Sequence, residues 1–180
     1  MSLPFRFASF AIPNQVFYQS ALSLGLVNLK PLVPGHVLVI PKRIIPRFGD
    51  LTTEEVSDLF LSVQTISRVI ESEYKAASMT IACQDGPLAG QSVPHTHIHI
   101  MPRHGGDFQP LDAVYEALDN NNFQEDYKRR QTRAERLQER QEKGVDAGDE
   151  RKARTEEEMR NEAMRLSQLF PEEVRGRFEG

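Results

Sequence analysis

A run of nine residues, from Pro94 to Pro102, restricts the possible fold more than any other part of the chain. Within it His95, His97 and His99 alternate with apolar or small residues. Successive side chains of a β-strand point to opposite faces, so a strand would place the three imidazoles on one face. A helix would separate them, because residues two apart do not face each other on a helix. We therefore predict a strand bounded by the two prolines, with a histidine face and an apolar face.

Further strands are predicted where aromatic and β-branched residues stand between turn signals. These strands lie at residues 5–7, 16–18, 23–29, 36–40 and 78–84. The strand at 36–40 is almost continuously apolar, which is typical of a central strand covered on both faces. In the strand at 78–84, Met79, Ile81 and Cys83 share one face, so we expect Cys83 in the core.

A long amphipathic helix is predicted over residues 52–74, where apolar residues, Phe60 among them, recur at three- and four-residue steps. Thr52 and Glu55 form a capping box at its start. A short helix is expected over residues 112–118, with Asp112 as its cap. A second capping box at Thr155 begins another helix. The apolar stripe of that helix consists of Met159, Ala163, Leu166 and Phe170.

Composition changes abruptly after residue 123. From residue 124 to residue 160 the chain has eleven Lys or Arg, eleven Asp or Glu, and almost no apolar residues. Such a segment cannot bury enough surface to offset its conformational entropy. We therefore expect a globular domain over 1–123 and a charged insertion over 124–154, either flexible or a solvated helix. Residues 155–180 should form a helix that docks back on the domain, followed by a tail.

Bulk properties narrow the classes of partner. The net charge of −4 argues against nucleic acid. The single cysteine excludes an internal disulfide and fits a reducing compartment. No apolar stretch approaches the ~20 residues of a membrane span, and the first residues lack the pattern of a signal peptide. We expect a cytoplasmic or nuclear protein that binds neither nucleic acid nor membrane.

The histidine run and its flanks resemble the signature of the histidine triad (HIT) superfamily. The segment from Pro34 to Pro41 resembles the upstream strand of the superfamily. Three other segments resemble its fragile histidine triad branch, the dinucleoside triphosphate hydrolases: Asn28 to Pro31, Gln84 to Val93 and Met101 to Phe108. The resemblance covers roughly residues 5–123 and 154–170. It implies an α+β fold in which an antiparallel sheet of about five strands carries one long helix on one face, plus a C-terminal helix. It also implies a homodimer.

The resemblance implies hydrolysis of diadenosine 5′,5‴-triphosphate to AMP and ADP. In this reaction His97 is the nucleophile and forms a covalent nucleotidyl-histidine. His95 and His99 would hydrogen-bond the phosphate and leaving oxygens, and His36 would hold the network in its working tautomers. The final triad position is His99 rather than glutamine, which favours hydrolysis over nucleotidyl transfer.

The resemblance also assigns the substrate-binding residues. Asn28 would bind ribose hydroxyls, and His99 would contact phosphate. The remaining phosphate ligands would be Gln84, Gly90, Gln91, Ser92 and Val93. A divalent cation, Mg²⁺ or Mn²⁺, would accompany the substrate, with no tightly bound cofactor and no metal site on the protein.

Other readings of these residues remain open. Three neutral imidazoles also suit zinc, so a zinc-binding module is one alternative. A nucleoside phosphoramidase of the same superfamily would share the triad, and a nucleotide-binding sensor with slow turnover would bind the same substrate. Taken singly, His36 could be a core histidine, Gln84 a partner of loop backbone, and Asn28 a turn residue.

Overall fold

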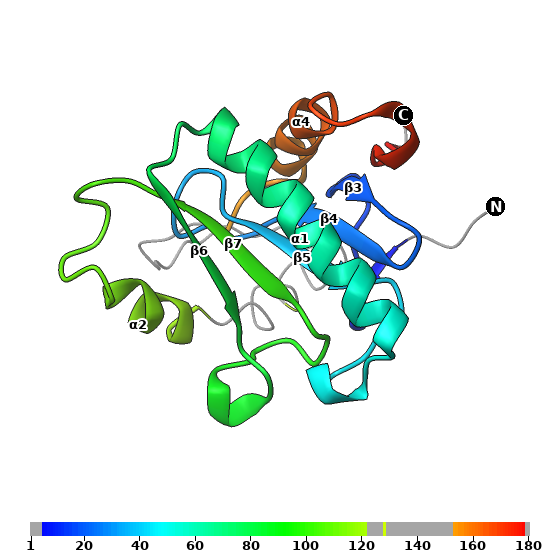
Figure 1. Cartoon of the computed structure of the whole chain (residues 1–180), viewed down its shortest axis with the longest axis horizontal. Coiled ribbons are helices and arrows are strands. Elements are labelled where there is room, and N and C mark those ends of the chain that lie inside the picture. Colours follow the sequence, from blue (N-terminus) through cyan, green and yellow to red (C-terminus); the bar gives the residue numbers. More distant parts are fainter. Residues whose placement is uncertain (1–4, 122–127, 129–152, 179–180) are drawn as a thin grey trace, which may run out of the picture.

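A five-stranded antiparallel sheet forms the centre of the computed structural model, which describes residues 5–121, 128 and 153–178 (Figure 1). Its strands, in spatial order, are β3 (Val16–Gln19), β4 (Ser23–Val27), β5 (Val37–Pro41), β7 (Ile98–Arg103) and β6 (Ser78–Cys83). A separate hairpin of β1 (Arg6–Phe7) and β2 (Phe10–Ala11) precedes the sheet. The predicted α+β class is confirmed, although the sequence analysis missed β2.

Strand β5 lies in the middle of the sheet, and all its residues are buried. It pairs with β4 on one side and β7 on the other, so that Val39 lies opposite both Gly25 and Ile98. This position explains the continuous apolar run, because both faces of a central strand pack against other layers.

Helix α1 (Thr53–Glu73) crosses one face of the sheet (Figure 1). The predicted capping box is confirmed: the Thr52 hydroxyl accepts the Glu55 N–H, and the Glu55 carboxylate accepts the Thr52 N–H. Glu55 also accepts hydrogen bonds from Nε and Nη2 of Arg43 at 2.7 and 2.6 Å, and this pairing lowers the pKa of Glu55 to about 2. Phe60, predicted on the apolar face, is instead 44% exposed.

Two further helices complete the fold. Helix α2 (Ala113–Asp119) begins after Asp112, which occupies the N-cap position without making a side-chain capping bond to any described residue, contrary to expectation. Helix α4 (Glu156–Ser167) starts with the predicted capping box and lies against β3 and β4. Its predicted stripe is buried, and Phe170 beyond its end packs on the rings of Phe17 and Tyr18. Short 3₁₀ turns occur at Phe48–Asp50, Pro87–Ala89 and Glu172–Val174.

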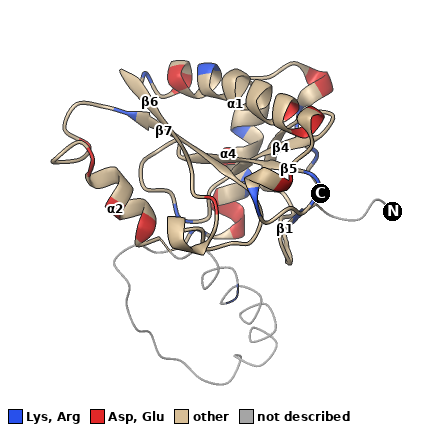
Figure 2. Cartoon of the chain, turned by 60° about the horizontal axis from the view of Figure 1, so that its bottom comes forward, with Lys and Arg blue, Asp and Glu red and all other residues tan. Residues whose placement is uncertain are grey.

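The predicted charged insertion lies outside the described residues, apart from residues 128, 153 and 154. In Figure 2 the sheet is almost entirely tan, the colour of uncharged residues, and the blue and red charged positions lie mostly on helices and loops. No helix among the described parts of the chain is long and apolar enough to cross a membrane.

Two predictions about strands were wrong. The histidine strand begins only at Ile98, because its pairing with both neighbours starts there. Ile98 pairs with Val39 of β5 and with Cys83, the last residue of β6, whereas β5 itself continues to Pro41 beside β4 alone. His95 and His97 therefore lie in the segment that leads into β7. Cys83 is exposed rather than in the core, because β6 is an edge strand.

Candidate active site

The four histidines predicted to act together do converge. His36 directly precedes β5, and His99 lies in the adjacent strand β7 opposite Leu38. The imidazole rings of His97 and His99 lie edge to face with centroids 4.9 Å apart. Phe7 of the N-terminal hairpin packs against His95 and His97, at centroid distances of 5.5 and 5.4 Å. All four histidines are buried.

Both ring nitrogens of His95 are engaged by backbone groups. The Ala8 N–H donates to Nδ1 at 3.0 Å, so the proton of the neutral ring sits on Nε2, which donates to the Pro41 carbonyl at 2.9 Å. Both ring nitrogens of His95 are thus engaged within the protein, and the His95 carbonyl accepts the Nδ1–H of His97. The expected direct contact of His95 with phosphate stays a prediction.

His97 has the arrangement of a nucleophile. Its Nδ1–H donates to the His95 carbonyl at 2.7 Å, which leaves the lone pair on Nε2. That Nε2 atom is buried and has no hydrogen-bond partner among the described residues. The carbonyl contact therefore selects the tautomer that can attack an electrophile.

A second pair of histidines forms a short relay. The Leu32 N–H donates to Nδ1 of His36 at 3.1 Å, so Nε2 carries the proton and donates to Nδ1 of His99 at 2.9 Å. His99 is thereby fixed with its proton on Nε2. The hydrogen bond places His36 where the predicted setting of the His99 tautomer requires it, and the role itself stays a prediction.

Asn28 packs against this relay without hydrogen-bonding to it, because its amide nitrogen and the protonated Nε2 of His36 are both donors. Its side-chain oxygen accepts the Lys30 N–H at 2.9 Å, and its amide nitrogen lies 3.2 Å from Nε2 of His36. The residue is fully buried. The contact of Asn28 with His36 was not predicted from the sequence, where Asn28 was expected to bind ribose or to be a turn residue.

Burial keeps all four rings neutral near pH 7. Desolvation, with smaller contributions from the charges of Arg154 and His97, lowers the pKa of His36 to about 3. Desolvation lowers the pKa of His95 to about 4 and also lowers that of His97. The pKa of His99 falls well below its usual value for the same reason. A neutral imidazole is the form required for nucleophilic attack.

The loop after β6 brings Gln84 next to this cluster. Gln84 directly follows Cys83, which pairs with Ile98, the residue after His97. The amide Nε2 of Gln84 donates to Oδ1 of Asp119, at the end of α2, at 2.7 Å. Gly90 lies against both side chains, because a Cβ there would stand 2.3 Å from that Nε2 atom and 2.6 Å from that Oδ1 atom.

The rest of the loop departs from the prediction in two places. The Gln91 side chain accepts the Gly86 N–H at 3.2 Å and donates to the Pro46 carbonyl at 2.8 Å, so its amide braces the loop instead of facing phosphate. Val93 is fully buried in the core, so only its backbone remains for a ligand. Ser92 stays partly accessible.

A metal site does not fit these donors. Among the described residues no three His, Cys, Asp or Glu side chains are arranged to hold a metal ion. The hydrogen bonds above explain why, since both nitrogens of His95 and both of His36 are engaged within the protein. The donor set therefore disagrees with the zinc-binding alternative.

Comparison with known proteins decides the family. The sequence matches the HIT domain over residues 9–106. The chain belongs to the HIT family. This match confirms the family predicted from the histidine run and its flanks.

Named relatives of this HIT protein point to one branch. It is 56% identical over 107 residues to the "Bifunctional bis(5'-adenosyl)-triphosphatase/adenylylsulfatase FHIT" of Arabidopsis thaliana, with 59% of each chain covered. It is 45% identical over 172 residues to the "Bis(5'-nucleosyl)-tetraphosphatase [asymmetrical]" of Schizosaccharomyces pombe, covering 93% of this chain and 94% of the relative. The C. elegans NitFhit crystal structure matches 92% of this chain and 30% of its own, with a TM-score of 0.66 and 35% identity. The predicted fold and fragile histidine triad branch are thus confirmed.

Proposed function

We propose that this HIT protein hydrolyses dinucleoside polyphosphates and cleaves diadenosine triphosphate to AMP and ADP. The observation that carries the proposal is the His97 side chain, whose Nδ1–H is held by the His95 carbonyl and whose Nε2 is free to attack. The names of the relatives, a bis(5'-adenosyl)-triphosphatase and an asymmetrical tetraphosphatase, support the same class of substrate.

The chemistry follows from the tautomers. Nε2 of His97 attacks the phosphorus of one adenylyl group, a phosphorus–nitrogen bond forms, and the phosphorus–oxygen bond to ADP breaks. The ring becomes positively charged, and the His95 carbonyl stabilises that charge through Nδ1–H. The Nε2–H of His99 donates to a substrate oxygen, while His36 holds His99 in that tautomer. Water then cleaves the phosphorus–nitrogen bond and releases AMP.

Phosphate binding involves the Gln84 amide, with Gly90 lying against it. Gln84 follows Cys83, which pairs with Ile98 next to His97, and an amide is a suitable donor to phosphate oxygens. The Gly90 N–H is engaged by the Pro87 carbonyl at 3.1 Å, so Gly90 contributes by its shape. Mg²⁺ or Mn²⁺ would arrive with the substrate and offset its charge. The expected cytoplasmic or nuclear location belongs to this proposal as well.

A substrate panel with purified protein tests the proposal. We expect a higher kcat/KM for diadenosine triphosphate than for an adenosine phosphoramidate, because the loop offers donors over more than one phosphate. Diadenosine tetraphosphate and adenylyl sulfate complete the panel, because the names of two relatives, an asymmetrical tetraphosphatase and an adenylylsulfatase, refer to substrates of these kinds. A preference for the phosphoramidate would place the protein with the phosphoramidases. Tight binding without turnover would make it a sensor.

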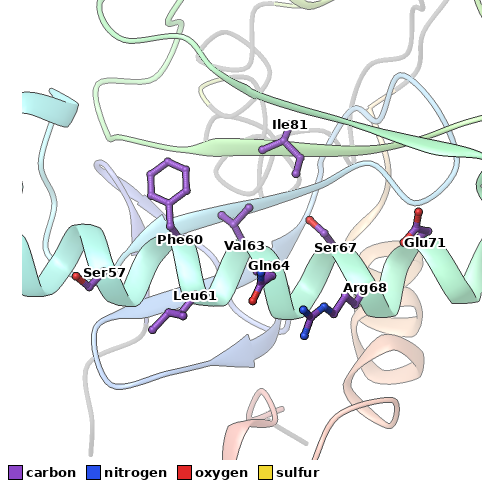
Figure 3. Close-up of a pocket in the computed structure, with 9 residues that line it drawn as sticks. All are labelled: Ser57, Phe60, Leu61, Val63, Gln64, Ser67, Arg68, Glu71 and Ile81. Carbon is purple, nitrogen blue, oxygen red and sulfur yellow. The ribbon is translucent and has the colours of Figure 1, made fainter.

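We also propose that the protein forms a homodimer through β6 and α1. Among the described strands β6 pairs with β7 alone, so its outer edge carries unpaired backbone groups. Beside this edge lies an apolar groove, where Phe60, Leu61 and Ile81 are 44%, 65% and 49% exposed. Figure 3 shows Ile81 of β6 pointing towards α1, with Phe60 and Val63 on the facing side of the helix.

A second copy of the chain suits this surface. Two β6 strands related by a two-fold axis pair antiparallel, and each then covers the apolar groove of the other. Sedimentation should give the mass of a dimer for the native protein and of a monomer for Ile81→Asp. The matched control is Leu22→Asp, an exposed leucine in the turn between β3 and β4, which should remain dimeric. A monomeric native protein would refute the dimer.

A further inference from the structure

A segment that lies outside the family match at residues 9–106 reaches the histidine cluster. Arg154 stands two residues before α4, and its Nε donates to the Asn28 carbonyl at 2.9 Å. Its Nη2 donates to the same carbonyl, and its backbone N–H donates to the Leu29 carbonyl at 3.0 Å. Nη1 pairs with Glu162 of α4. The guanidinium is thus held at both ends, with only 18% of the side chain exposed.

Asn28 brings this arginine next to the relay through packing on the His36 ring, not through a hydrogen bond. Strand β4 ends at Val27, so the Asn28 carbonyl lies beyond the ladder that pairs β4 with β5. Arg154 supplies the donors that the sheet does not. The side-chain amide of Asn28 lies 3.2 Å from Nε2 of His36, which in turn donates to His99 at 2.9 Å.

We propose that Arg154 is a positioning residue of the active site, which holds the Asn28–Leu29 backbone and through Asn28 the His36–His99 pair. The proposal rests on the function given above. The planar guanidinium fixes the carbonyl from two nitrogens at once, a geometry that lysine cannot reproduce. A displacement of about 1 Å in such a support can cost on the order of a hundredfold in rate.

The charge of Arg154 has a second effect. The groups that face His36 are Arg154 from the C-terminal segment, Asn28 from the end of β4, and His97 and His99 from the segment of β7. The positive charge of Arg154 opposes protonation of His36 and adds to the effect of burial on its pKa. Glu162 partly neutralises that charge. Loss of Arg154 should therefore make His36 easier to protonate.

A second arginine, within α4 itself, supplies the control. Among the described residues Arg165 contacts Glu73 and Tyr74, both at the C-terminal end of α1. Like Arg154 it ties α4 to the domain through a carboxylate. Within the described part of the chain it makes no hydrogen bond to Asn28 or the histidines, so Arg165→Gln weakens docking of the helix without removing the support of Asn28.

The experiment compares full-length Arg154→Gln, Arg154→Lys, Glu162→Gln and Arg165→Gln. Steady-state kinetics give kcat and KM, and ¹⁵N spectra of the histidine rings follow the protonation of His36 as the pH is lowered. For Arg154→Gln we expect kcat/KM to fall at least tenfold, with protonation of His36 beginning at higher pH. Arg154→Lys should restore the protonation behaviour but only part of the activity. Glu162→Gln should shift protonation of His36 to lower pH.

Arg165→Gln should lower Tm without moving either the protonation of His36 or kcat/KM. If Arg154→Gln behaves like Arg165→Gln, with lower Tm and unchanged His36 spectra, Arg154 is purely structural and the proposal is wrong. If Arg154→Gln does not fold, the opposite effects expected for Arg154→Lys and Glu162→Gln decide the question. The spectra need no substrate, so they test Arg154 even if the native protein fails to hydrolyse dinucleotides.

Discussion

Lowering the pH from 7 to 5 should destabilise this protein, because the folded state excludes protons from its buried histidines. The pKa of His36 is about 3 and that of His95 about 4, whereas histidines of the unfolded chain titrate near 6.5. Below pH 6.5 the histidines of the unfolded state therefore bind protons, whereas those of the folded state do not. The contribution of the neutral histidines to the free energy of unfolding is fully present above pH 6.5 and is lost progressively as the pH falls towards the folded pKa values.

The magnitude follows from linkage. At pH 5 an unfolded histidine is almost fully protonated and His36 is almost fully neutral, so each such residue lowers the unfolding free energy by about 2 kcal/mol relative to pH 7. His36 and His95 together amount to about 4 kcal/mol, a large part of the 5–15 kcal/mol typical of a domain. His97 and His99 act in the same direction. Glu55, whose pKa is lowered to about 2, does not contribute in this window, because unfolded carboxylates protonate near pH 4.

Urea unfolding at pH 7, 6 and 5, at one protein concentration, measures this loss. For each buried histidine the unfolded state binds about one more proton than the folded state, which gives the unfolding free energy a slope of about 1.4 kcal/mol per pH unit. His36→Gln should reduce the slope of stability against pH by that amount, and His36→Gln with His95→Gln by twice as much. A native protein equally stable at pH 7 and 5, or a slope unchanged by His36→Gln, would refute the reasoning.

Three further changes have defined outcomes. Gly90→Ala should lower kcat/KM at least tenfold in steady-state assays, because φ of Gly90 is +87° and the new Cβ would stand 2.3 Å from Nε2 of Gln84. The control is Gly49→Ala, where no atom lies within 4 Å of the new Cβ and no effect is expected. Equal activity of the two variants would contradict the role of the loop. Elemental analysis should find far less than one zinc per chain, and stoichiometric zinc that is lost with activity on chelation would contradict the assignment of the histidines. Deleting residues 126–150 and closing the gap with a short Gly/Ser linker should leave turnover within a few-fold; a hundredfold loss with the fold intact would mean that this segment reaches the site.

Local patterns predicted the elements that depend on neighbours in sequence. The capping boxes at Thr52 and Thr155 need only residues a few positions apart, and both were confirmed. The apolar period of α1 is equally local and was confirmed apart from Phe60. The start of β7 was missed because it depends on where pairing with two partner strands stops. Cys83 was misplaced because an edge strand cannot be told from an inner one before the strand order is known.

The same limit applies to the site. The spacing of the triad identified its histidines, but their tautomers are set by distant partners. Ala8 contacts His95 across 87 residues, and Arg154 contacts Asn28 across 126 residues. No pattern in the chain marks either pair. Only the fold brings them together.

Replacement of His97 tests its role as the nucleophile. His97→Asn removes the attacking nitrogen but keeps a polar group of similar reach. We expect turnover to fall at least about a thousandfold, or roughly 4 kcal/mol of transition-state stabilisation. Substrate affinity should change far less, because Gln84 and the other ligands remain. Loss of binding with turnover little changed would make His97 a structural residue.

Attack by Nε2 of His97 is tested most directly by rapid acid quench of the native protein during its first turnover of diadenosine triphosphate. The account predicts one adenylate per active site, attached to His97 through a phosphorus–nitrogen bond, with release of ADP before AMP. Inversion of configuration at phosphorus in a single turnover, with no adduct on His97, would mean that water attacks directly and would contradict the account.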